Sequence, residues 1–188
     1  MLKTKHVFFL LCAFFMLSGC TSLLPSAKQT ILSPWQSFDE AKTAFDKIIP
    51  YKTTGEDLKQ LGFDPFLTPN IKILTYLDIA STTAFITRQN MDEGLRACVE
   101  AKTDCHAYEF EPKFIAKKRY GNFWLDFFNF RRQTRETGWK FKALIVTING
   151  TVVYKLWAGN PLIDEKTDIK NPLGPLQDTG DMILKGLL

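Results

Sequence analysis

The sequence predicts an α+β domain in which two or three N-terminal helices pack on an antiparallel meander of three or four strands. Apolar residues recur at helical spacing over residues 37–61, and long aromatic runs begin near residue 105. Asn149-Gly150, a strong hairpin signal, separates two of these runs. Helices followed by sequential strands are typical of this class. The length of 188 residues with 45% hydrophobic and 23% charged residues fits one globular domain and excludes disordered, collagen-like and multi-pass membrane classes.

The first twenty residues have the features of an export signal, in the order that such signals have. Lys3 and Lys5 precede an apolar run at residues 7–17, which is too short to span a bilayer. Residues 17–20, Leu-Ser-Gly-Cys, resemble the lipobox of bacterial lipoproteins. This resemblance implies that residues 1–19 are a signal peptide and that Cys20 becomes the acylated first residue, with palmitate among its acyl chains. Several acyl chains together give a stable membrane anchor.

The residue after Cys20 is Thr21, and the absence of Asp at that position resembles lipoproteins exported to the outer membrane of Gram-negative bacteria. We therefore expect a lipid-anchored protein that faces the periplasm, with residues 20–33 as its flexible tether. Removal of residues 1–19 leaves 169 residues with 22 basic and 20 acidic side chains, a net charge of +2. This small charge gives no support for nucleic-acid binding.

The cysteines predict one structural disulfide. Cys12 leaves with the signal and Cys20 carries the lipid, so Cys98 and Cys105 remain as a pair in an oxidising compartment. The alternative is a redox dithiol or a metal site. It lacks a Cys-x-x-Cys motif, and His106 is the only histidine of the mature chain.

Helix signals come first along the domain. The spacing predicts helices over residues 37–49 and 54–61, followed by an irregular connection at 63–70, a helical turn at 71–79 and a short helix at 92–99 that ends near Cys98. The first two helices each carry a capping box, formed by Ser37 with Glu40 and by Thr53 with Glu56.

Strand signals follow. Aromatic and β-branched runs predict strands at 107–111, 121–130, 139–148 and 151–158. Asn149-Gly150 predicts a type I′ turn between the last two. We expect residues 131–138 to form a loop, the domain to cover residues 34–160, and residues 161–188 to be a C-terminal extension.

Residues 52–65, Lys-Thr-Thr-Gly-Glu-Asp-Leu-Lys-Gln-Leu-Gly-Phe-Asp-Pro, resemble the Leu-Gly-x-Pro helix motif of the small SmpA/OmlA outer-membrane lipoprotein domain, the BamE type. The hairpin at 141–157 would match the last two strands of that family. This chain has one extra residue between Gly62 and Pro65, and its segment 71–104 has no counterpart. The resemblance implies a non-catalytic accessory that supports β-barrel folding or envelope integrity through protein contacts.

The expected strand 121–130 is the main candidate binding element. Basic residues at 117–119 and 131–135 would lie at its opposite ends, about 30 Å apart, as two separate patches. Both of its faces are aromatic, so one would face the helices and the other would need the tail, the segment 71–104 or a partner as cover. The candidate partner-binding residues are Trp124, Phe128, Phe130, Arg131, Arg132 and Arg135.

Catalytic signals are sparse. His106 could act as a base with Ser37 or Ser81, but no G-x-S-x-G elbow supports this. Carboxylate pairs begin predicted helices, where the helix dipole explains them, and no metal or cofactor motif is present. We therefore expect a non-catalytic envelope lipoprotein that binds other outer-membrane or periplasmic proteins. The alternative is a lipid- or small-molecule-binding domain with its pocket between sheet and helices.

Overall fold

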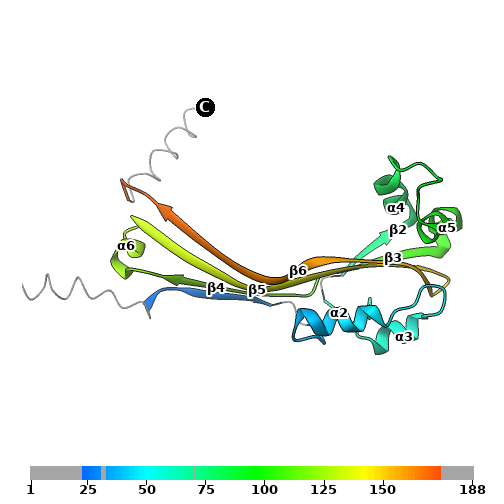
Figure 1. Ribbon diagram of the computed structural model, residues 1–188, viewed down its shortest axis with the longest axis horizontal. Coiled ribbons are helices and arrows are strands. Elements are labelled where there is room, and N and C mark those ends of the chain that lie inside the picture. The colour runs from blue at the N-terminus through cyan, green and yellow to red at the C-terminus, as the bar shows by residue number, and fades with distance from the viewer. Residues whose placement is uncertain (1–22, 31–32, 70, 175–188) are drawn as a thin grey trace, which may run out of the picture. The chain divides into compact units, whose positions relative to one another are not determined.

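The computed structural model describes residues 23–30, 33–69 and 71–174 (Figure 1). The predicted signal peptide and Cys20 lie outside the described residues. Within the described ranges, no helix is long and apolar enough to cross a membrane. The elements in chain order are β1 (Ser26–Thr30), α2 (Phe38–Asp46), α3 (Gly55–Gln60), β2 (Lys72–Thr75), α4 (Tyr76–Thr83), α5 (Glu93–Ala101), the 3-10 turn η2 (Lys102–Asp104), β3 (Cys105–Phe110), β4 (Lys113–Tyr120), α6 (Phe123–Phe127), β5 (Arg131–Ile148) and β6 (Thr151–Lys170).

The chain divides into two compact units. The described part of unit 1 comprises residues 23–28, 116–137 and 164–174, whereas unit 2 comprises the described residues of 29–115 together with 138–163. The boundary passes within strands β1, β4, β5 and β6, so both units take part in strand pairing.

The β5 strand carries most of this pairing. It pairs with β3, β4 and β6, while β1 joins β4 and β2 joins β3. The β3–β5 pairing is antiparallel and places Cys105 opposite Ile148 and Phe110 opposite Ala143. Because side chains alternate along a strand, successive β5 residues of unit 2 lie on opposite faces of the sheet.

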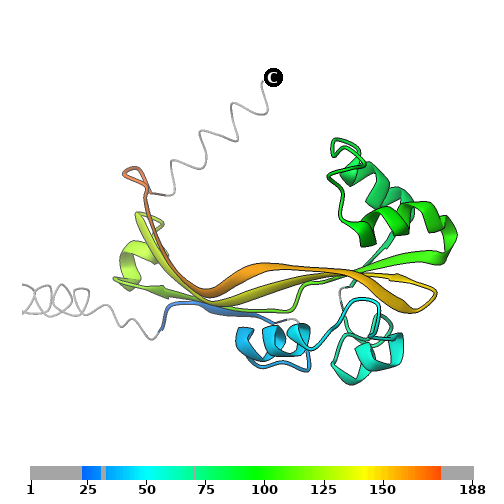
Figure 2. The same cartoon turned by 45° about the vertical axis from the view of Figure 1, so that its right-hand side comes forward.

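One face of the unit 2 sheet is covered by α2 and α3 (Figures 1 and 2). Its core is aromatic and centres on Phe63, which is fully buried and lies 4.5 Å from Trp35 and 5.2 Å from Phe110 between ring centroids. The Lys155 ammonium donates to the carbonyl oxygen of Phe45 at the end of α2, 3.0 Å away. Burial lowers the pKa of this lysine.

The opposite face is covered by α4 and α5. The predicted disulfide is confirmed, because Cys98 of α5 is bonded to Cys105 at the start of β3, with their Cα atoms 5.1 Å apart. Helix α5 approaches β6 closely at Gly94, where an added Cβ would lie 2.2 Å from the carbonyl oxygen of Val153. Only glycine allows this approach.

The predicted fold class is wrong. The described residues form a six-stranded antiparallel sheet and five short helices, rather than N-terminal helices on a meander of three or four strands. Residues 71–104 supply strand β2 and the two helices of a second layer, and β1 and β4 form in segments for which no strand was predicted. The helical turn expected at 71–79 is β2 followed by α4, whose capping box is formed by Thr75 and Asp78.

The local signals at the hairpin are confirmed. Asn149 and Gly150 have φ values of 49° and 78°, as a type I′ turn requires, and they join β5 to β6. However, β6 does not end near residue 160, since it continues to Lys170. The strand β1 likewise lies within the segment that we expected to be a flexible tether.

The helices predicted at 37–49, 54–61 and 92–99 are confirmed as α2, α3 and α5 with shifted ends. Their caps differ in detail. The Ser37 hydroxyl accepts from the Glu40 amide as expected, but the box of α3 is formed by Thr54 and Asp57 rather than by Thr53 and Glu56. The Thr53 hydroxyl instead accepts from the Ile49 amide, 2.8 Å away.

The core of unit 2 predicts different effects for two nearby phenylalanines. We expect Phe63→Ala to lower the free energy of unfolding by about 3–5 kcal/mol, because it leaves a cavity among packed rings. Phe66→Ala removes a ring that is 79% exposed and should change it by less than about 0.5 kcal/mol. Urea unfolding of the two variants checks this, and equal effects would contradict the assigned core.

Candidate interaction surfaces

The strand expected at residues 121–130 is wrong, because its centre is the short helix α6. Gly121, with φ of 99°, ends the preceding strand, and the Asn122 side chain accepts from the amides of Trp124 and Leu125 at 2.9 and 3.3 Å. This is an N-cap, which satisfies donors at the start of the helix. The aromatic residues favoured a strand, but the Gly-Asn pair and its cap determine the local structure.

Helix α6 is oriented so that its acidic residue, Asp126, faces the strands β4 and β5. The side chain of Asp126 is 4% exposed, and its Oδ1 lies 3.1 Å from a terminal nitrogen of Arg119 and 3.6 Å from Nε of Arg132. A buried carboxylate is stable only with such cationic partners. Arg119 comes from β4 and Arg132 from β5, so the carboxylate attaches α6 to two strands.

The outward side of α6 carries apolar side chains. We call Phe123, Trp124, Leu125, Phe127 and Phe128 the aromatic surface. Its rings contact one another, with centroids 5.7 Å apart for Phe123 and Phe127 and 6.1 Å apart for Trp124 and Phe128. Phe127 is nevertheless 65% exposed and Phe128 46% exposed. A helix that buries its carboxylate and exposes its aromatic rings reverses the usual distribution of polarity.

The two basic clusters do not lie at opposite ends of one strand, so their expected separation is wrong. Because β4 pairs with β5, Lys117 forms a 2.7 Å ion pair with Glu136, and Arg119 and Arg132 share Asp126. The clusters therefore face each other across neighbouring strands.

The candidate arginines are largely engaged within unit 1. Arg131 donates two hydrogen bonds to Asp168, at 3.0 and 2.6 Å, and Arg135 donates two to Asp164, both at 2.7 Å. Phe130 lies against Gly174, where an added Cβ would be 2.8 Å from its ring. Of the six candidate partner-binding residues, Trp124 and Phe128 belong to the aromatic surface.

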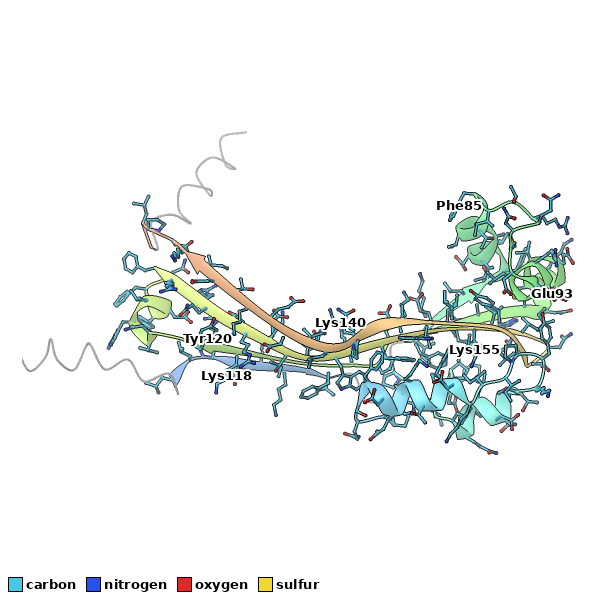
Figure 3. All side chains as sticks on the ribbon, in the orientation of Figure 1. Phe85, Glu93, Lys118, Tyr120, Lys140 and Lys155 are labelled. Atoms are coloured by element: carbon cyan, nitrogen blue, oxygen red, sulfur yellow. A yellow bond between two sulfur atoms is a disulfide. The ribbon has the colours of Figure 1, made fainter. Side chains whose placement is uncertain are left out.

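The ion pairs matter because unit 1 has little core. Among its described residues no apolar side chain is buried, and the buried residues are Asp126 and Gly174. The hollows on its surface are lined mainly by charged and small side chains, and Lys118 and Tyr120 on β4 line one of them (Figure 3). Strand pairing and cross-strand ion pairs therefore stabilise unit 1.

Unit 2 carries a second surface, which we call the apolar groove. It is a hollow of about 400 Å³ next to α4 and the sheet face that α4 covers. Its apolar lining consists of Leu74, Ile79, Phe85, Ile86, Leu95, Leu144, Tyr154 and Leu156. Phe85, labelled in Figure 3, is 84% exposed, and Leu156 is 53% exposed.

Sequence reasoning did not identify the apolar groove. Leu144 and Leu156 were placed in the predicted hairpin, where alternation implies one face that needs cover. The helices that form the rest of the groove come from the segment whose position could not be predicted. Burial and the nearby carboxylate of Asp92 raise the pKa of Tyr154 in this groove.

The residues considered for catalysis are dispersed. His106 is exposed on β3, opposite Thr75 of β2. Ser37 caps α2, and the Ser81 hydroxyl donates to the carbonyl of Asp78. In the described part of the chain, His, Cys, Asp and Glu form no group of three or more that could hold a metal ion.

The chain matches no family model, and neither the curated proteins nor the solved structures contain a significant match to it.

Removal of the Asp126 carboxylate should destabilise α6 locally. We expect Asp126→Ala to speed amide hydrogen exchange of residues 123–130 at least about tenfold, since two arginines lose their shared carboxylate and the helix its attachment. Glu165→Ala, at an exposed carboxylate of the same unit, is the control and should leave this exchange unchanged. Equal exchange in the two variants would show that Asp126 does not hold α6.

Unit 1 should also lose stability in acid. Hydrogen bonds from Arg135 and Arg131 hold the pKa values of Asp164 and Asp168 below their usual range. The ion pairs therefore stabilise the folded state above the unfolded-state pKa of about 3.9, and this contribution is lost as pH falls through the lower folded-state values. We expect the exchange protection of residues 131–137, corrected for intrinsic rates, to fall in that range. The Asp164→Asn, Asp168→Asn double variant should lack this dependence, and an identical pH profile would contradict the assignment.

Proposed function

We propose that this chain is a non-catalytic, lipid-anchored protein of the outer membrane that faces the periplasm and acts as an accessory or scaffold by binding another envelope protein. The apolar groove is its contact surface in this proposal. Membership of the SmpA/OmlA family stays a prediction, and the proposed contact does not depend on it.

The exposed apolar lining of the groove is the observation that carries this proposal. Phe85 and Leu156 remain largely exposed, whereas other large side chains of unit 2, such as Phe63, are buried in a packed core. Contiguous exposed apolar side chains on a folded domain mark interaction sites. The polar residues at the groove, among them Lys72 and Asp78, would supply the polar rim that protein interfaces have.

Two exposed aliphatic residues of β6 allow a matched test. A photo-crosslinking amino acid at Leu156 of the full-length lipoprotein in intact cells should give a discrete protein adduct, whereas the same probe at Leu162, which is 81% exposed and does not line the groove, should not. Phe85→Ser should reduce the adduct at least about tenfold, as loss of an aromatic anchor does. Identical adducts at both positions, or an adduct only within this chain, would contradict the proposal.

The groove volume also favours a second candidate, the binding of a lipid or another small apolar molecule. Small-molecule sites commonly have volumes of about 300–1,000 Å³, and the groove falls within this range. Native mass spectrometry of a non-acylated Cys20→Ser variant separates the two functions. A bound molecule that is lost in the Phe85→Ser variant would favour the small-molecule site.

A further inference from the structure

The aromatic surface of unit 1 needs its own explanation, because its apolar side chains are held outward by the structure. The Asp126 carboxylate is turned inward onto Arg119 and Arg132, which leaves Phe127 and Phe128 as the outer side of α6. The helix therefore presents its rings to whatever surrounds unit 1.

Chain connectivity limits the distance between the aromatic surface and Cys20. The carbonyl oxygen of Pro25, just before β1, accepts a hydrogen bond from the amide of Arg119, 3.3 Å away. Pro25 lies five positions after Cys20, a reach of at most about 18 Å, and Phe123 lies four positions after Arg119, at most about 14 Å. The start of β1 and helix α6 lie at the same end of unit 1 (Figures 1 and 2).

The net charge of unit 1 also favours a position near the bilayer. The described residues of unit 1 carry nine basic and five acidic side chains, a net charge of +4, whereas those of unit 2 carry twelve basic and thirteen acidic, a net charge of −1. A positive surface near a bilayer is attracted to anionic lipid headgroups. Trp and Phe side chains are suited to the boundary between headgroups and acyl chains.

We propose that the aromatic surface of α6 inserts into the interface of the bilayer that holds the Cys20 lipid. The chain would then contact its membrane at two points, the acyl chains and α6. The inference rests on the lipid anchor of the proposed function, but it does not depend on what fills the apolar groove.

Tryptophan fluorescence tests the insertion in the full-length acylated protein. The protein is reconstituted in phosphatidylcholine vesicles, with and without phosphatidylserine, whose acyl chains carry bromine as a quencher. Trp124 is in unit 1 and the three other tryptophans are in unit 2. We therefore expect Trp124→Phe to remove at least about half of the quenching.

Substitutions at the surface sharpen this test. The Phe127→Ser, Phe128→Ser double variant should reduce quenching of Trp124, whereas Phe66→Ser with Leu67→Ser, two exposed apolar residues of unit 2, should not. Equal quenching in the native protein and the Trp124→Phe variant would overturn the proposal. So would increased Trp124 quenching in an Ile183→Asn, Leu184→Asn variant, which would show that the C-terminal residues cover the surface instead.

Two further outcomes keep the proposals separate. Failure of the protein to float with the vesicles would refute the lipid anchor itself, while a floating protein without Trp124 quenching would refute insertion alone.

A photo-crosslinking residue at Phe127 that yields protein adducts in intact cells, and none to lipid, would overturn insertion and assign the aromatic surface to a protein partner.

Discussion

The hydrogen bonding of β5 is the constraint on which the other elements depend. Three strands pair with it directly, and β1 and β2 are attached to the sheet only through β4 and β3. In unit 2 its alternating side chains take part in both cores, with Ile145 on the face of α2 and α3 and Val146 on the face of α4 and α5. A one-residue slip of this register would exchange the two sets and disrupt both layers.

The two units are stabilised by different interactions. Unit 2 buries aromatic rings beneath α2 and α3 and closes its second layer with the Cys98–Cys105 disulfide. Unit 1 lacks buried apolar side chains in its described part and relies on strand pairing and ion pairs such as Arg135–Asp164. Exposed ion pairs contribute little stability individually. Unit 1 is therefore the part of the chain most able to gain from an apolar environment.

Sequence reasoning succeeded where the determining interaction is local and failed where it joins distant residues. Asn149-Gly150 predicts its hairpin, and Ser37 caps the helix that follows it. The inward orientation of α6 was not predictable, because Asp126 needs arginines from two strands.

The extended strands were missed for a similar reason. Residues 131–137 of β5 are polar on both faces and resemble a loop, but cross-strand partners more than 25 residues away hold them in the sheet. The candidate site was partly predictable. Trp124 and Phe128 were identified by their aromatic context, whereas Arg131 and Arg135 form ion pairs within unit 1. The apolar groove could be identified only once the position of α4 was known.

Insertion of α6 would bring unit 1 to the membrane while unit 2 stays available to a partner. Amide hydrogen exchange tests it most directly, by comparing the acylated protein in vesicles with a non-acylated Cys20→Ser variant in solution. We expect slower exchange in vesicles at residues 119–130, with residues 72–104 unchanged. Slowing across residues 72–104, or no change at α6, would contradict it.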